Sequence, residues 1–269
     1  MCRASENTID HRLKRLKIKA VFGVLPLCLL LASCASSGGS AAISSKTNPQ
    51  DNTAGIHAEL AANYLSSGQL EIAREELEMG LDIQKSHSDA NYVSALLMLR
   101  LNELEEADEY FRRAIKSNSA NAAASHDYGV FLCRRGRYRE SVDYFLLAAD
   151  NPLFTNSHLS LSRAGECIAE ESIEEGEALL RRALDVDPSI PSALAKMAEI
   201  RFSQENFMGA RAYVERYISV VEPDARTLLL GFDVEQALHD TAAASKYRDQ
   251  LLEIYPESAE VIRLRASTR

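Results

Sequence analysis

Tryptophan is absent from this sequence of 269 residues, and so are the short motifs that mark catalytic and nucleotide-binding sites. The six histidines show no His-x3-His spacing and form no group with cysteines or acidic residues, so the sequence offers no metal site. It has no glycine-rich phosphate loop, no Gly-x-Ser-x-Gly and no calcium-binding loop. We therefore expect a binding protein with no catalytic residue, no cofactor and no small-molecule substrate.

Positive charge is concentrated in the first part of the chain. The formal net charge of the whole sequence is −9, and residues 1–33 carry a net +4, which leaves −13 for the remainder. No stripe of lysine and arginine runs through that remainder. Because an acidic surface repels the phosphate backbone, we exclude nucleic acid as a partner.

A period of 34 residues organises most of the chain. Residues 101–115 have a counterpart at 135–149, in which Phe111 corresponds to Phe145. Followed in both directions, the period gives six copies, at 54–87, 88–121, 122–156, 157–190, 191–224 and 225–258. Each copy holds two stretches with apolar residues at i, i+3/i+4 and i+7, the spacing of amphipathic helices. The pattern resembles the tetratricopeptide repeat, and it predicts an all-α fold, an α-α superhelix of about six helical hairpins.

Glycine, proline and small residues fall where such hairpins need them. Gly68 and Gly136 are expected in tight turns between two helices, and Pro188, Pro223 and Pro256 are expected to end second helices. Small residues recur on the first helices where the second must approach closely, at Ala61, Ala95, Gly129, Ala164 and Ala198. Residues 259–269 then predict a short capping helix and tail, which would cover the last hairpin.

The first 33 residues have the form of an export signal. A basic stretch at 11–19 precedes an apolar run that is too short to span a membrane. The run ends in Leu31, Ala32, Ser33 and Cys34, which resembles the bacterial lipoprotein box. The resemblance implies cleavage before Cys34 and lipidation of its thiol and new amino group. The alternative is an ordinary secretory signal that happens to contain a cysteine.

The residues after Cys34 bear on where the chain would be anchored. Ala35 occupies the position directly after Cys34, where an aspartate would favour retention of a lipoprotein in the inner membrane. By analogy with known lipoprotein sorting, we therefore expect an outer-membrane protein that faces the periplasm. The segment 34–53 is rich in serine and glycine and predicts a flexible tether between the lipid and the repeats.

Cys133 and Cys167 are the cysteines left in the repeats. An oxidising periplasm would permit a bridge between them. However, packed helices lie about 8–10 Å apart, which usually holds Cα atoms beyond disulfide reach. We therefore expect two free thiols that pack as small apolar residues, and leave the bridge as the alternative.

The second copy is apolar nearly all round over 92–99, which is more than packing requires. An apolar patch bordered by arginine is typical of a groove for a peptide or strand. The predicted partner-binding groove comprises Leu65, Tyr92, Leu96, Leu99, Arg100, Val130 and Arg134. The alternative is that these residues pack in the core.

Two further segments carry a family resemblance. Asp-Tyr-Gly-Val-Phe-Leu at 127–132, followed by Arg137-Tyr138, and Arg-Thr-Leu-Leu-Leu-Gly at 226–231 resemble segments of the PilF/PilW family of type IV pilus biogenesis lipoproteins. The resemblance spans about 54–258. It implies a pilotin, an adaptor that binds subunits of the outer-membrane secretin and promotes their localisation and multimerisation. The alternatives are a scaffold for cell-wall hydrolases and a component of outer-membrane protein assembly.

Overall fold

The computed structural model describes residues 49–267, and every regular element in that range is an α-helix. The expectations for residues 1–33, for lipidation at Cys34 and for most of the tether lie outside the described residues. Within 49–267, no helix has both the length and the apolar character needed to cross a membrane.

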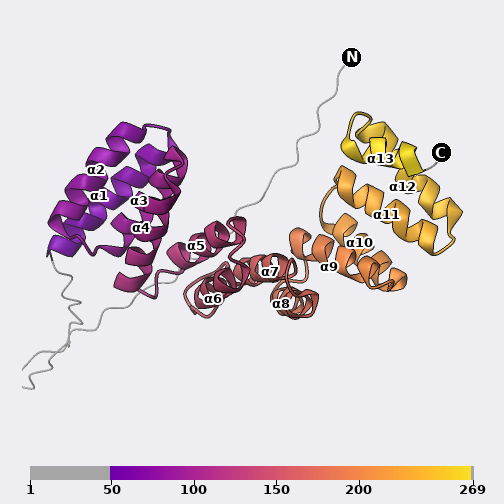
Figure 1. Cartoon of the computed structure of the whole chain (residues 1–269), viewed down its shortest axis with the longest axis horizontal. Helices are drawn as coiled ribbons and strands as arrows, with labels where there is room; N and C mark the ends of the chain where they lie inside the picture. The colour runs from indigo at the N-terminus through magenta and orange to yellow at the C-terminus, as the bar shows by residue number, and fades with distance from the viewer. Residues whose placement is uncertain (1–48, 268–269) are drawn as a thin grey trace, which may run out of the picture. The chain divides into compact units, whose positions relative to one another are not determined.

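The helices form six consecutive hairpins and a final short helix (Figure 1). They are α1 (Pro49–Ser66), α2 (Leu70–Ile83), α3 (Ser88–Leu101), α4 (Leu104–Ser117), α5 (Ala122–Arg134), α6 (Tyr138–Ala149), α7 (Ser157–Ile168), α8 (Ile173–Val186), α9 (Pro191–Ser203), α10 (Phe207–Val220), α11 (Ala225–Ala237), α12 (Thr241–Ile254) and α13 (Ala259–Ser267). Each odd-numbered helix from α1 to α11 packs on the helix that follows it, and each hairpin packs on the next along the chain. The predicted fold class, a tetratricopeptide-type array of six hairpins with a capping helix, is confirmed.

Turn residues set the hairpins as the sequence predicts. Gly68 and Gly136 have φ of 78° and 73°, and Asn102 takes the same left-handed conformation at the end of α3 with φ of 62°. An ordinary side chain is strained in this region, whereas glycine and asparagine adopt it at low cost. The first helix differs from expectation, because α1 begins at Pro49 and includes the last residues of the predicted tether.

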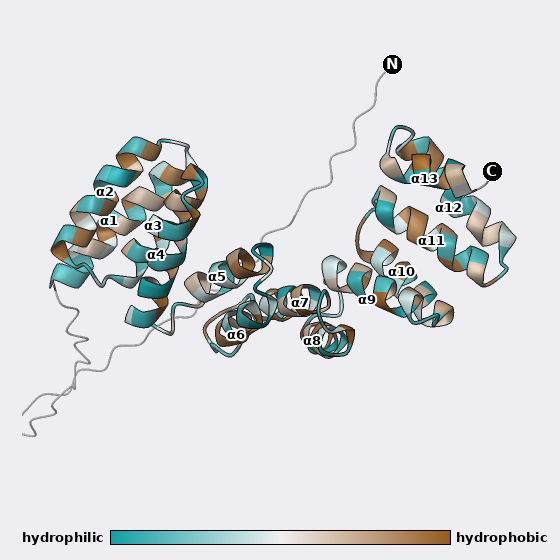
Figure 2. Cartoon of the chain, in the orientation of Figure 1, coloured by the Kyte–Doolittle hydropathy of each residue, from teal (hydrophilic) through white to brown (hydrophobic). Residues whose placement is uncertain are grey.

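The core alternates small and large side chains along the array. The predicted small positions are buried, and Phe111 and Phe145 fill the space beside them at 0% and 1% exposure. Apolar and polar residues both appear on every hairpin (Figure 2), as expected where only part of each helix faces the core. At the end of the array, Val261 and Leu264 of α13 are buried against α11 and α12. The faces of the first helices that do not pack in this core can therefore contribute side chains to a binding surface.

Candidate functional site on the first helices of hairpins two to four

Helices α3 and α5 are fixed at their N-termini by side-chain caps. The ring of His87 accepts a hydrogen bond from the amide of Ala90, and the side chain of Asn121 accepts one from the amide of Ala124. Such caps satisfy amides that have no partner within the helix. The Asn121 amide also donates to Asp89 Oδ1 at 2.9 Å, which joins the two helix starts directly.

A pocket of about 510 Å³ lies between α3 and α5; we call it the α3–α5 pocket. Its apolar wall consists of Leu96, Leu99, Leu104, Val130 and Phe131. Its polar wall consists of Asn102, Asp127, Arg134 and Arg135. Four of the predicted groove residues, Leu96, Leu99, Val130 and Arg134, are therefore brought together in one concave surface.

A hydrogen bond between α3 and α5 holds the geometry of this pocket. The Tyr92 hydroxyl donates to Asp127 Oδ2 at 2.6 Å, which ties α3 to α5. Burial and the neighbouring Asp127 carboxylate raise the pKa of the Tyr92 phenol far above its ordinary value, so the hydroxyl stays protonated as a donor. Tyr92 thus supports the pocket through Asp127 without lining it.

Behind the pocket, an aromatic cluster fixes Phe131. Its ring lies 5.9 Å from that of Phe111 and 6.0 Å from that of Tyr128, measured between centroids. Tyr128 is fully buried, and its hydroxyl donates to Asp108 while accepting from Arg112, each at 2.9 Å. Burial is the main cause that raises the pKa of Tyr128 to about 12. A buried hydroxyl with both partners satisfied gives a rigid wall.

A second pocket of about 510 Å³ lies between α5 and α7; we call it the α5–α7 pocket. It shares Val130 and Arg134 with the first pocket. Its other lining residues are His126, Cys133, Tyr138, Phe145, Arg163, Glu166, Cys167 and Glu170. Sequence reasoning missed most of this pocket, because its walls come from α5, α6 and α7 and no single repeat contains them.

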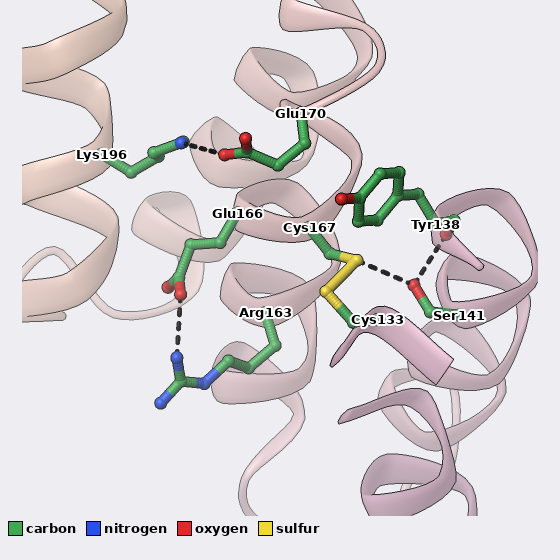
Figure 3. The surroundings of a disulfide bond; sticks show 8 residues. All are labelled: Cys133, Tyr138, Ser141, Arg163, Glu166, Cys167, Glu170 and Lys196. Carbon is green, nitrogen blue, oxygen red and sulfur yellow. Dashed lines mark hydrogen bonds and ion pairs between the residues drawn. A yellow bond between two sulfur atoms is a disulfide. The ribbon is translucent and has the colours of Figure 1, made fainter. Parts of the chain in front are cut away.

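A disulfide between Cys133 and Cys167 forms part of the α5–α7 pocket (Figure 3). The Cα atoms lie 5.9 Å apart, and the Ser141 hydroxyl lies 3.0 Å from the Cys167 sulfur. The expectation of two free thiols is therefore wrong. Cys133 is the twelfth residue of α5, whereas Cys167 is the eleventh of α7. A shift of one residue along a helix turns the side-chain direction by about 100° around the helix axis. The two cysteines therefore do not occupy equivalent positions in their repeats.

The remaining predicted groove residues lie elsewhere. Leu65 is buried at 6% exposure in the cluster formed with Ala61, Leu77 and Leu97, so the core takes its surface and it cannot contact a partner. Arg100 is exposed in the last turn of α3, outside the walls of both pockets. The groove prediction thus stands as a candidate for Leu96, Leu99, Val130 and Arg134, with Tyr92 in support.

Stacked two-helix hairpins with a small-and-large core and a concave surface on their first helices define a tetratricopeptide-repeat protein. No family model matches the chain. It is 28% identical over 242 residues to the type IV pilus assembly protein PilF of Pseudomonas aeruginosa, a match that covers 88% of this chain and 94% of that protein.

Two solved structures agree with this match. The structure of Pseudomonas aeruginosa PilF aligns with a TM-score of 0.71 and 27% identity over 81% of this chain and 99% of that one. A structure of PilW, described as a widely conserved type IV pilus biogenesis factor, aligns with a TM-score of 0.68 and 29% identity over 78% and 97%. The chain is thus a tetratricopeptide-repeat protein similar along most of its length to PilF and PilW, which are proteins of type IV pilus biogenesis.

Proposed function

We propose that this protein is an outer-membrane lipoprotein that acts as a pilotin. Through the two pockets it binds secretin subunits in the periplasm, and it promotes their localisation and multimerisation in the outer membrane. The role is one of binding, with no catalytic step. The observation that carries this proposal is the concave apolar surface at Leu96, Leu99 and Val130, in a chain related to pilus biogenesis proteins along most of its length.

The pockets have the anatomy of a protein-binding surface. Leu96, Leu99 and Val130 are half-buried, so they keep apolar area that the fold itself does not bury. Contact with a partner removes such area from water, which contributes a favourable free energy of about 25 cal/mol per Å² of apolar surface. Charged side chains border the apolar floor, as is usual where an interface core meets its rim.

The anchor is the second part of the proposal. Lipidation at Cys34 would leave fifteen residues before α1 begins at Pro49, and a chain of that length reaches at most about 50 Å when extended. Tethering of this kind raises the effective concentration of a client at one membrane. The bridge between Cys133 and Cys167 supports export, because disulfides persist in oxidising compartments such as the periplasm.

Co-purification from detergent-solubilised outer membranes tests the function. The wild-type protein should carry the secretin with it. The variant Cys34→Ala should incorporate no labelled palmitate, should leave the outer-membrane fraction, and should reduce secretin multimers. Equal palmitate in both proteins would refute the anchor. Recovery of cell-wall hydrolases or barrel-assembly proteins in place of the secretin would refute the pilotin role.

A further inference from the structure

Most of the charged side chains that line the two pockets have a partner within the molecule. On the acidic side, the Asp127 carboxylate accepts from the Tyr92 hydroxyl at 2.6 Å, and Glu170 Oε1 lies 2.7 Å from Lys196 Nζ. The third carboxylate, Glu166, pairs with an arginine of the same wall. Because the Tyr92 hydroxyl is a neutral donor, Asp127 has no cationic partner in residues 49–267, whereas Glu166 and Glu170 each have one.

The basic side chains divide differently. Arg163 pairs with Glu166 at 2.9 Å (Figure 3), and Arg135 lies 3.5 Å from Glu105 with its guanidinium 5.8 Å from the centre of the Phe131 ring. Arg134 is exposed, and within residues 49–267 it has no ion-pair partner. It is the one arginine in the lining of either pocket that has no ion-pair partner in this part of the chain.

Arg134 also occupies the shared wall. It and Val130 belong to α5 and line both pockets, so a guanidinium stands between two apolar hollows of equal volume. Burial lowers the pKa of His126, the titratable imidazole of this wall, so that ring supplies no second positive charge at neutral pH. A ligand that spans both pockets must therefore pass this one cation.

The spacing of the pockets fits an extended chain. One lies between α3 and α5 and the other between α5 and α7, so a ligand that enters both must cross α5, and a helix with its side chains is about 10–12 Å wide. An extended chain rises about 3.3 Å per residue and places alternate side chains on the same face, so residues i and i+4 span about 13 Å on one face. Two apolar side chains four positions apart can thus enter the two pockets, while the side chain midway between them faces Arg134.

We propose that this surface selects an extended client segment in which an acidic residue stands midway between two apolar residues four positions apart. The apolar side chains occupy the two pockets, and the carboxylate pairs with the Arg134 guanidinium, whose planar fork matches a carboxylate. This inference rests on the proposed function for the identity of the client, and on the pocket lining alone for the chemistry of the segment.

Selection from a random heptapeptide phage library tests the inference, with the purified, detergent-solubilised full chain as bait. The wild-type protein should enrich Asp or Glu between two apolar residues. Replacing that acid by its amide in a synthetic peptide should weaken binding about tenfold, the effect of losing a hydrogen bond to a charged group. In Arg134→Gln, the apolar preference should remain and the acidic preference should vanish.

Arg100→Gln is the matched control. Arg100 precedes Arg134 by one repeat and also lies in the last turn of a first helix, but it lines neither pocket. Its variant should select the same peptides as the wild type. An acidic preference that survives in Arg134→Gln, a wild-type consensus without an acid, or no consensus at all would overturn the inference. If the acid-dependent selection holds but the secretin does not co-purify with the wild type, the proposed client is wrong and the inference about this surface stands.

Discussion

The packing of α5 on α6 gives a sharp test, because adding a single methyl group should destabilise the protein. A Cβ atom on Gly129 would lie 2.8 Å from Cδ1 and 2.9 Å from Cε1 of the Phe145 ring, closer than nonbonded carbon atoms approach. Phe145 is 1% exposed, and the His126 ring packs edge-on against it at 5.5 Å, so the phenyl ring has little freedom to withdraw. Gly129→Ala should therefore strain this hairpin.

Two opposing terms set the size of the effect. Alanine in a helix interior is favoured over glycine by about 1 kcal/mol, which would stabilise the variant. Overpacking a well-filled core costs about 1–3 kcal/mol. The net expectation for Gly129→Ala is a loss of about 0–2 kcal/mol, and Gly129→Leu should lose more because more atoms must be accommodated.

A second glycine isolates the helix term. In α1, a Cβ on Gly55 would meet its nearest atom, Nε2 of His87, at 3.5 Å, which is ordinary contact. Gly55→Ala should therefore raise the free energy of unfolding by about 1 kcal/mol, whereas Gly129→Ala should not raise it.

Thermal melting followed by circular dichroism measures both variants. For a domain of this size, 1 kcal/mol corresponds to about 2–4 °C in melting temperature. If Gly129→Ala raises the melting temperature as much as Gly55→Ala does, the close approach of α5 and α6 is refuted, and with it the register of the third hairpin.

Further outcomes follow from single contacts. The variant Leu99→Asp should keep its helical content and lose secretin binding, because Leu99 lines the α3–α5 pocket. The control Leu97→Asp places a charge at a site that is 1% exposed and should unfold the protein. If both variants unfold, Leu99 is a core residue and not part of the binding surface. The Cys133–Cys167 bridge closes a loop of 34 residues, so dithiothreitol should lower the free energy of unfolding by about 3–4 kcal/mol, and a double serine variant should not respond to it. Because burial lowers the pKa of His126, the unfolded chain binds its proton more readily; stability should fall as the pH drops below about 6.5, and His126→Gln should flatten that slope in acid titrations.

The period of the sequence carries most of the fold. The first helices of hairpins two to six begin at residues 88, 122, 157, 191 and 225, so the spacing is 34 except for one step of 35. A repeat of this length fixes both helix positions and the packing of each hairpin on the next, because the same small and large residues return in each copy. The packing contacts of each hairpin can therefore be predicted from the local sequence pattern.

What the period could not predict lies between repeats. The step of 35 puts Cys133 and Cys167 at different positions of their helices, and their Cα atoms lie 5.9 Å apart, closer than the average spacing of packed helices predicts. Leu65 was expected in the groove because it is an apolar residue of a first helix, yet the structure uses it to pack hairpin one on hairpin two. In both cases the outcome depends on side-chain direction across a contact, and spacing along the chain does not encode that direction.

Ion pairs between neighbouring repeats distinguish the later first helices from the surface around Val130. On α9, Lys196 pairs with Glu170, which follows α7, and Arg226 of α11 lies 2.7 Å from Glu199. These contacts cross from one repeat to the next and engage the ionic groups there, so a ligand would have to displace them. Around Val130 the surface instead offers apolar hollows and an unpaired guanidinium. A partner gains there both the burial of apolar area and a new ion pair, without losing a contact that the free protein already makes.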